Sequence, residues 1–383
     1  MINEKMRELG AKRSVIRELF EYGKKRKAEI GEDKVFDFSL GNPSVPAPEK
    51  VDEAMARLLQ NEDSVKLHGY TSAQGDASVR EAIAEYINST YEEDVNADCI
   101  YMSVGAAAAL TCSLTALVSP GEEVIVPSPY FPEYKVFIER CGGVIRAVPC
   151  DENMQPDVGA IEASVNEKTA AIIINSPNNP TGAVYSDENI KVLCYALRRA
   201  ERRLGHPIYL ISDEPYRELV YDEIKLPYLT KYYNNTLVCY SFSKSLSIPG
   251  ERIGYVLVSP RCENFTSVYQ AVCGAGRALG FVCAPSLLQK MLPSCLGLTA
   301  DISVYDRNRR LLIEKLTEYG FEMIKPQGAF YLFIKSPSGD ATEFCERAKK
   351  QEILIVPSDD FGIGGCANLH AVATVKKDRK SVV

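Results

Sequence analysis

Short apolar runs alternate with helical patterns along most of the chain, and this alternation limits the possible folds most strongly. The runs are bounded by Gly, Pro, Asn or Asp, as buried strands usually are. The clearest runs cover residues 123–126, 170–174, 208–211, 236–240 and 254–258. Helical patterns lie near residues 48–60, 76–90, 105–118, 133–141, 187–203 and 302–319. We therefore expect an α/β fold whose mostly parallel sheet is sandwiched by helices.

The pattern changes after about residue 280, where the apolar segments 328–333 and 353–356 are set among helices. This change predicts a smaller α+β domain. A chain of 383 residues is long enough for two or three domains. We expect the N-terminal helix and segment, residues 1–45, to join the small domain at residues 281–383, and residues 46–280 to form the large domain.

Composition excludes several classes of function. The net charge of −7 argues against a nucleic-acid partner, which needs a basic face. No apolar stretch reaches the roughly 20 residues that span a bilayer, so no membrane partner is expected. The twelve cysteines form no CxxC pair and the three histidines are dispersed, so no metal site is expected. Reduced thiols and a charged, periodic N-terminus predict a cytoplasmic protein.

Polar residues follow three of the predicted strands directly. Residues 175–182 follow the run at 170–174, residues 212–216 follow the run at 208–211, and a loop with a lysine follows the run at 236–240. In open α/β sheets, ligands bind beyond the carboxyl ends of the strands. The sequence therefore predicts a functional site at this end of the sheet.

The loop that follows the run at 236–240 contains Lys244, with two hydroxyl side chains just before it and Arg252 eight residues after it. An amine can bind an aldehyde covalently, and a guanidinium fork suits phosphate oxygens. This cluster could hold a phosphorylated aldehyde. A lysine among serines is by itself more typical of a solvated loop, so the interpretation depends on the other motifs.

Four motifs appear together in a fixed order: Asn179-Pro-Thr-Gly182, Asp213-Glu-Pro-Tyr216, the loop at 241–252, and Gly328-Ala-Phe330. In this combination the chain resembles the class I and II aminotransferases, which use pyridoxal 5′-phosphate (PLP). The resemblance covers residues 30 to 365. It implies the PLP-dependent transferase fold of type I. It also implies ping-pong transfer of an amino group from an L-amino acid to a 2-oxo acid.

The resemblance assigns roles to the residues that match these motifs. Lys244 would form an aldimine with PLP and later move a proton from the substrate Cα. Asp213 would face the pyridine nitrogen and keep it protonated. Tyr216 and Asn179 would donate hydrogen bonds to the 3′-oxygen of the cofactor. A lowered pKa of Lys244 would follow from burial and from nearby positive charge.

The same resemblance implies how the phosphate would be held. Arg252 and Ser241 would donate to its oxygens. Gly105, Ala106 and Ala107 begin a helix after an extended segment, and small residues there let a helix N-terminus approach an anion. An alanine-rich helix start is more often plain packing, so this segment carries little weight alone.

Further matches concern the ring, the substrate and assembly. Tyr130 resembles the aromatic residue that stacks on the cofactor ring. Gly41, Asn179 and Phe330 would lie next to the substrate. Tyr70 resembles the tyrosine that reaches the phosphate of the partner subunit's cofactor. If so, the site lies at a two-fold interface and the protein works as a homodimer.

The C-terminal tail departs from the family pattern. The motif Asp360-Phe-Gly362 is present, but the arginine that should follow it and clamp the substrate carboxylate is missing. Its slot lies between Ala367 and His370, and imidazole lacks the planar fork of guanidinium. Arg277 is another candidate for pairing with a dicarboxylate substrate, and is equally interpretable as a surface charge.

Three explanations of this departure stay open. The scaffold could serve an unusual substrate or a related reaction, such as a carbon–sulfur β-lyase. It could be a catalytically impaired PLP-binding protein. The tail could also be in a different reading frame from its ancestor, since the codons for residues 366–369, read one nucleotide on, permit Val-Arg-Ile-Ser.

Overall fold

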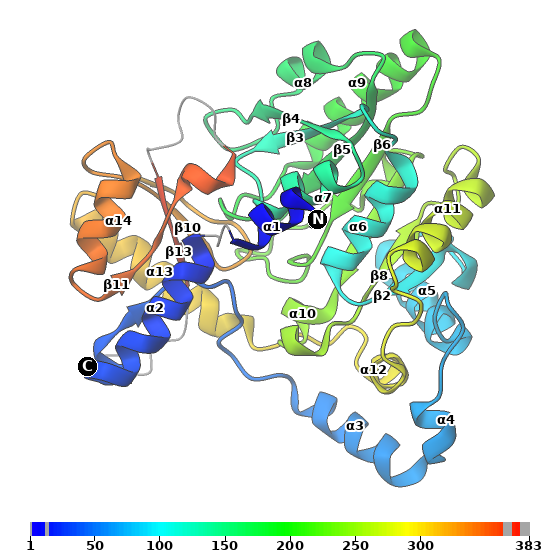
Figure 1. The fold of residues 1–383 in the computed structure, drawn as a ribbon, viewed down its shortest axis with the longest axis horizontal. Coiled ribbons are helices and arrows are strands. Elements are labelled where there is room, and N and C mark those ends of the chain that lie inside the picture. Colours follow the sequence, from blue (N-terminus) through cyan, green and yellow to red (C-terminus); the bar gives the residue numbers. More distant parts are fainter. Residues whose placement is uncertain (1, 12–14, 363–369, 376–383) are drawn as a thin grey trace.

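The structure is a computed structural model that describes residues 2–11, 15–362 and 370–375. Its centre is a seven-stranded sheet in the order β2-β8-β7-β6-β5-β3-β4 (Figure 1). The strands are β2 (Ile100–Ser103), β3 (Glu123–Ser128), β4 (Val144–Pro149), β5 (Thr169–Asn175), β6 (Tyr209–Asp213), β7 (Thr236–Ser241) and β8 (Gly254–Val258). The pairs from β4 through β7 are parallel, whereas β8 runs antiparallel to both of its neighbours. The prediction of a mostly parallel sheet is confirmed.

Helices cover both faces of this sheet, and β5 shows why its sequence is a continuous apolar run. Ile173 packs in one hydrophobic cluster with α6 (Ala106–Leu117), whereas Ile172 and Ile174 pack in another with α9 (Asp187–Leu204). Successive side chains of a strand point to opposite faces. Every residue of β5 is buried as a result, and a strand buried on both faces cannot alternate between apolar and polar residues.

Among the remaining helices of the large sheet, α3 (Glu49–Asn61), α5 (Ala77–Tyr91) and α7 (Glu133–Arg140) begin and end close to predicted patterns. No pattern predicted the others, which are α4 (Ser64–His68), α8 (Val158–Ser164), α10 (Phe242–Ser245), α11 (Phe265–Ala278) and α12 (Ser286–Met291). Polar side chains cap the N-termini of several helices. The Asp76 side chain accepts hydrogen bonds from two backbone amides of α5, and the Ser186 side chain accepts one from a backbone amide of α9.

A second sheet has the order β12-β13-β10-β9 and is antiparallel. Its strands are β9 (Met323–Ile324), β10 (Tyr331–Lys335), β12 (Val356–Pro357) and β13 (His370–Thr374), and two helices accompany it, α13 (Ile302–Glu318) and α14 (Ala341–Lys349). A separate parallel pair joins β1 (Phe36–Asp37) to β11 (Ile353–Leu354). This pair and a shared hydrophobic cluster connect the N-terminal segment to the small sheet.

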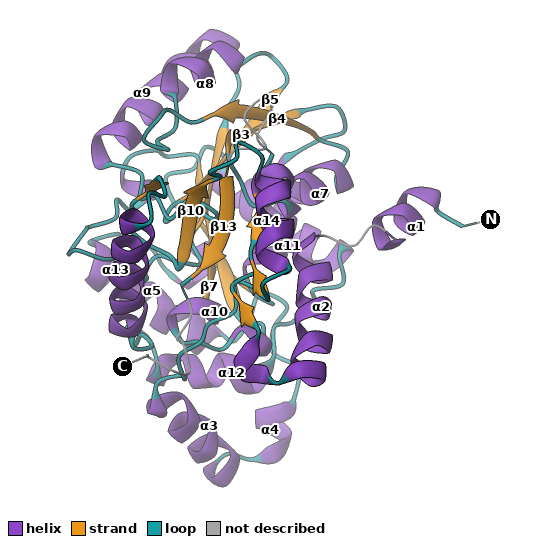
Figure 2. Cartoon of the chain, turned by 90° about the vertical axis from the view of Figure 1, so that its left-hand side faces the viewer, coloured by secondary structure: helices purple, strands orange, loops and turns teal. Residues whose placement is uncertain are grey.

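The two N-terminal helices differ in their surroundings. Helix α2 (Val15–Ile30) buries Leu19 in the cluster of the small sheet. Helix α1 (Glu4–Ala11) has no buried residue, and Figure 2 shows it standing away from the rest of the chain. The limits of the predicted domains stay a prediction, since the same cluster also contains Tyr216 and Tyr221 from the large-sheet region.

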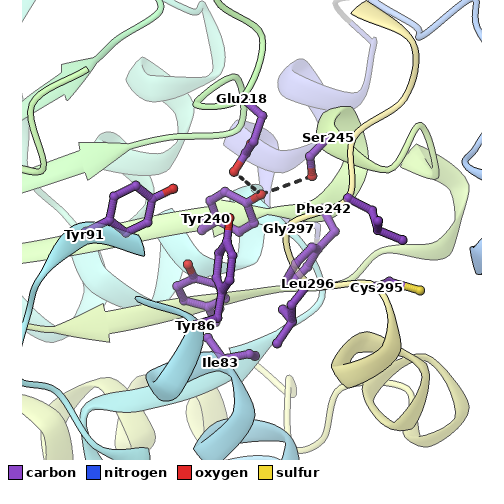
Figure 3. A pocket seen from close by; sticks show the side chains of 12 residues that line it. Ile83, Tyr86, Tyr91, Glu218, Tyr240, Phe242, Ser245, Cys295, Leu296 and Gly297 are labelled. Carbon is purple, nitrogen blue, oxygen red and sulfur yellow. Dashed lines mark hydrogen bonds between the residues drawn. The ribbon is translucent and has the colours of Figure 1, made fainter. Parts of the chain in front are cut away.

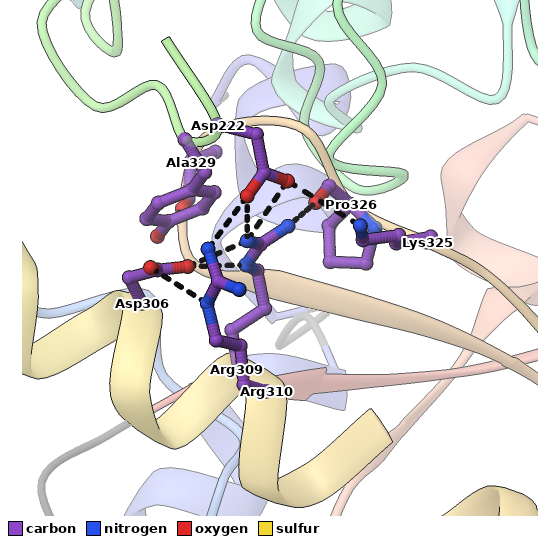
Figure 4. A network of polar contacts seen from close by, with 8 residues as sticks. Asp222, Asp306, Arg309, Arg310, Lys325, Pro326 and Ala329 are labelled. Atoms are coloured by element: carbon purple, nitrogen blue, oxygen red, sulfur yellow. Dashed lines mark hydrogen bonds and ion pairs between the residues drawn. The ribbon is translucent and has the colours of Figure 1, made fainter. Parts of the chain in front are cut away.

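A polar network fastens the loop after β6 to α13 (Figure 4). The fully buried Arg309 donates to Asp222 Oδ2 at 3.0 Å, to Asp306 Oδ1 at 2.8 Å and to the carbonyl oxygen of Pro326 at 2.8 Å. Arg310 donates to the other oxygen of Asp222 at 2.7 Å. Because the buried guanidinium has several acceptors, its charge is compensated.

The described residues offer neither a membrane-spanning helix nor a metal site. None of the helices in residues 2–11, 15–362 and 370–375 combines the length and apolarity needed to cross a membrane. Nor does this part of the chain contain a group of three or more His, Cys, Asp or Glu side chains that could hold a metal ion.

Candidate active site

A cleft of about 300 Å³ lies at the carboxyl ends of β5, β6 and β7. These strands are adjacent and parallel, so their ends bring polar residues together at one edge of the sheet. The predicted site residues that line this cleft are Gly41, Ala106, Ala107, Asn179, Asp213, Tyr216, Ser241, Lys244 and Arg252. Residues far apart in sequence thus meet at this edge, and Asn179, Asp213 and Lys244 come from the segments that the strand-end rule singled out.

Lys244 lies on the single turn of α10, directly after β7. Its Nζ atom donates a hydrogen bond to the carbonyl oxygen of Gly41 at 2.7 Å and lies 5.4 Å from the centre of the Phe330 ring. Burial, together with the nearby positive charge of Arg252, lowers the pKa of Lys244 to about 8. A neutral amine is therefore accessible near neutral pH, as a nucleophile or base requires.

Asp213 ends β6 and is buried. Its Oδ2 atom accepts a hydrogen bond from the Tyr134 hydroxyl at 2.5 Å, and Asn175 Nδ2 donates to its backbone oxygen at 3.0 Å. Burial raises the pKa of Asp213 to about 7, although the bond from Tyr134 acts in the opposite direction. Its Oδ1 atom is buried and has no partner within the described residues. A buried acceptor without a donor costs free energy, so this atom is available for a ligand donor.

Tyr216 and Asn179 lie on the same side of the cleft. The Tyr216 hydroxyl is 2.7 Å from the hydroxyl of Tyr331, and either can be the donor. Burial raises the pKa of Tyr216 well above its ordinary value, and Tyr331 adds to the rise. The backbone amide of Asn179 donates to Asn175 Oδ1 at 2.7 Å, which fixes the loop. Both side chains can donate to one ligand oxygen.

The end of the cleft near α6 is rich in donors. Arg252 Nη1 donates to the carbonyl oxygen of Pro249 at 2.9 Å and lies 3.5 Å from Ser243 Oγ, which accepts from Ser241 Oγ at 2.8 Å. Gly105 precedes α6 with a φ of +88°, and a Cβ there would lie 2.9 Å from Arg252 Nη2. Glycine is needed both for this backbone conformation and for the approach of the guanidinium. The arrangement suits an anionic group.

Two aromatic residues differ from their predicted placement. Phe131 lines the cleft, whereas Tyr130 does not; the Tyr130 ring packs against Gly362 instead. Likewise Tyr331 lines the cleft, whereas its neighbour Phe330 is buried and borders the site through ring contacts with Lys244 and Tyr216. In both pairs, one of two consecutive aromatic residues lines the cleft and the other does not. The stacking role proposed for Tyr130 therefore fits Phe131 better.

The sequence prediction missed two residues that hold Asp213. Asn175 is the last residue of β5, and the rule that placed Asp213 at a strand end would also have found it. Tyr134 lies on α7 and reaches Asp213 from a different element. No spacing in the sequence marks this contact, because it depends on how α7 packs on the sheet.

The candidates for binding the substrate carboxylate are placed as follows. Arg277 is exposed near the end of α11 and does not line the cleft. His370 lies on β13 and stacks on the Phe333 ring at 4.3 Å between centroids. Residues 363–369 lie outside the described residues, so the predicted arginine slot and the reading-frame hypothesis stay untested. Among the described residues that line the cleft, Lys244 and Arg252 are the cationic side chains.

Comparison with known proteins identifies the family. The chain matches the family described as aminotransferase class I and II over residues 33–379. It belongs to this family.

This aminotransferase is similar to several named proteins and solved structures. It is 33% identical to an aspartate aminotransferase of Thermotoga maritima, with 94% of this chain and 93% of that protein covered. A crystal structure of an amino transferase from Eubacterium rectale has a TM-score of 0.96 at 53% identity and covers 99% of this chain and 95% of that chain. The aspartate aminotransferase of Thermus thermophilus with maleate has a TM-score of 0.84 at 27% identity, with coverages of 96% and 94%. The predicted fold and aminotransferase activity are confirmed.

Proposed function

We propose that this aminotransferase works with PLP bound in the cleft and that L-aspartate is its amino donor. The observation that carries the cofactor assignment is the buried Oδ1 atom of Asp213, which has no protein donor within the described residues and lines the cleft. A protonated pyridine nitrogen supplies the donor that this carboxylate lacks. When bound, PLP draws electron density away from the substrate Cα through its protonated ring.

The remaining residues fit the other parts of PLP. The amine of Lys244, with its lowered pKa, would bind the aldehyde carbon. Tyr216 and Asn179 would donate to the phenolic oxygen. Arg252, Ser241 and the backbone amides at the start of α6 would hold the phosphate. Phe131 would lie against the ring.

Lys244 would also move the proton of the reaction. With PLP and an amino acid bound, the Nζ atom of Lys244 would take the proton from the substrate Cα and later give it back. A pKa of about 8 suits both steps near neutral pH. The carbonyl oxygen of Gly41, 2.7 Å from Nζ, is an acceptor that can hold the amine close to the site.

The choice of aspartate rests on the names of the relatives. Those from Thermotoga maritima and Pyrococcus horikoshii are aspartate aminotransferases, and that of Thermus thermophilus is an aspartate/prephenate aminotransferase. Because Lys244 and Arg252 are assigned to the cofactor, the substrate carboxylates need further donors. The amide of Asn179 and the backbone of Gly41, which both line the cleft, are two such donors.

We also propose that the protein is a homodimer and that Tyr70 completes the partner's site. The Tyr70 side chain is 99% exposed, which is unusual for a large aromatic residue unless a second chain covers it. Light scattering should give the mass of two chains, and Tyr70→Phe should weaken PLP binding. A monomer with full activity would rule this out. We place the protein in the cytoplasm, since its described cysteines are free thiols.

The test of the function uses PLP-loaded protein, L-aspartate and 2-oxoglutarate. Oxaloacetate and glutamate should form in equal amounts, and Lys244→Ala should abolish this. Lys231→Ala is the control, because Lys231 pairs with Glu92 on the surface. Release of pyruvate and ammonia from a sulfur-containing amino acid without an acceptor would instead indicate a β-lyase. If none of the amino acids tested gives a product, the protein would be a catalytically impaired PLP-binding protein.

A further inference from the structure

The helical turn that carries Lys244 depends on its neighbours for its position. Helix α10 contains only Phe242–Ser245, and a single turn is not stable alone. At its start, Ser241 Oγ accepts a hydrogen bond from the amide of Ser243 at 3.2 Å. At its end, the carbonyl oxygen of Ser245 accepts from the amide of Ala300 at 2.7 Å. The Ser245 side chain makes a third contact, on the side away from the cleft.

This third contact leads to a buried carboxyl group (Figure 3). The Tyr240 hydroxyl lies 3.1 Å from Ser245 Oγ and 2.8 Å from Glu218 Oε1. A phenol has one proton to donate. If Tyr240 donates to the carboxyl oxygen, then Ser245 must donate to Tyr240, and the three groups form a directed chain. Glu218 thus determines how the end of α10 is held.

The second carboxyl oxygen of Glu218, Oε2, is shielded from water. The Oε2 atom is buried and has no partner within the described residues. Glu218 lines a small cavity of about 10 Å³ together with Tyr86, Tyr91 and Tyr255, which is space for at most about one water molecule. Burial raises the pKa of Glu218. A half-satisfied buried carboxyl group stabilises a fold less than an apolar side chain of similar size, so stability alone does not account for it.

We propose that Glu218 is a positioning residue for Lys244, which acts through Tyr240 and Ser245 to fix the turn that carries the amine. The proposal rests on the proposed role of Lys244 but does not depend on which amino acid is the substrate. It predicts that the environment of the Lys244 amine changes when the chain of hydroxyl groups is broken, even without cofactor.

The first measurement is made on the full chain without PLP. The rate at which a small amine-reactive reagent labels Lys244 is followed by mass spectrometry as a function of pH. In the unchanged protein the midpoint should lie near pH 8. In Tyr240→Phe and Glu218→Leu it should move towards the ordinary lysine value, because the loosened turn lets the amine reach water. Glu218→Gln keeps an acceptor for Tyr240 and should behave like the unchanged protein.

The second measurement uses the PLP-loaded enzyme. Tyr240→Phe and Glu218→Leu should each lower kcat about tenfold with little change in KM. The double variant should have the same kcat as either single variant, because both substitutions break the same chain of hydrogen bonds. Glu93→Leu is the control: Glu93 is buried and bonded to Thr230 Oγ1 at 2.7 Å, and should lower stability without these effects.

Two outcomes would overturn the proposal. One is an unchanged labelling midpoint in Tyr240→Phe, a variant that removes a single oxygen atom and is the decisive one if Glu218→Leu does not fold. The other is an equal loss of kcat in Glu93→Leu and Glu218→Leu. Because labelling needs neither PLP nor substrate, its result is independent of whether the proposed aspartate activity is found.

Discussion

The Nζ atom of Lys244 and the carbonyl oxygen of Gly41 form a hydrogen bond across 203 residues of sequence. The lysine comes from the turn after β7, and the glycine comes from the segment that connects β1 to α3. The amine is therefore held between the large sheet and the N-terminal segment. Its chemistry depends on both parts of the chain.

The lowered pKa of Lys244 gives a prediction about pH. In the protein without PLP, reaction of this amine should reach its half-maximal rate near pH 8, whereas an ordinary lysine would do so near 10.5. Between these values the unfolded chain binds more protons than the folded one, so Lys244 should make the free energy of unfolding rise with pH there. Labelling and urea denaturation across pH 7 to 11 would measure both effects. A midpoint near 10.5 would contradict the prediction.

Removing the Tyr134 hydroxyl should impair the function of Asp213. Without this donor the pKa of Asp213, already about 7, should rise further, and its carboxylate would pair less well with a protonated ring. A buried hydrogen bond to a charged group contributes about 1.5–3 kcal/mol. We expect kcat/KM of Tyr134→Phe to fall about 10- to 100-fold. Tyr233→Phe removes a buried hydroxyl bonded to the oxygen of Ile208. An equal loss of kcat/KM in this control would refute the role of Tyr134.

Two glycines with nearly the same positive φ allow a matched test of the phosphate end. Gly105 has a φ of +88° and Gly121 a φ of +87°, but only at Gly105 would a Cβ meet Arg252. Alanine at either position should destabilise the fold by about 1–2 kcal/mol through backbone strain. Only Gly105→Ala should displace Arg252 and weaken PLP binding, by about tenfold. Equal PLP affinities in titrations of the two variants would count against the assignment.

The network around Arg309 should contribute to stability. Asp222→Asn removes a charged partner of this fully buried guanidinium, and we expect the free energy of unfolding to fall by about 1–3 kcal/mol. The exposed pair of Glu343 and Arg347, at 4.0 Å, is the control: Glu343→Gln should change stability by less than about 0.5 kcal/mol. Urea denaturation would compare the two. A null effect of Asp222→Asn would show that Asp306 and Pro326 are sufficient partners.

The central strands of the large sheet were predictable from the sequence because a buried parallel strand has a recognisable local pattern, whereas the order of the strands was not predicted. Buried parallel strands are continuous apolar runs, and the predicted run at 170–174 is now β5. Strand β4 was missed because Arg146 and exposed positions interrupt its apolar pattern. The antiparallel direction of β8 was not predicted either, since an apolar run carries no information on direction. That information comes from the connection, here the turn that ends at Arg252.

The site was predictable where function requires a residue type at a strand end, and not where it depends on side-chain direction. Lys244 and Asn179 follow strands, Asp213 ends one, and all three line the cleft. The choice between Tyr130 and Phe131, by contrast, depends on the direction of each side chain between β3 and α7, which a sequence motif does not reveal. Tyr134 could not be found at all, because helix packing brings it to Asp213.

The bond between Lys244 and Gly41 has a consequence for the order of folding. Except for β2 and β8, neighbouring strands of the large sheet are joined by much shorter connections than the 203 residues that this bond spans. Contacts between distant parts of a chain cost more loop entropy and tend to form later. During refolding, we expect the sheet to form before the lysine acquires its low pKa. The reactivity of one amine, followed in time, would report when the N-terminal segment has closed over the completed sheet.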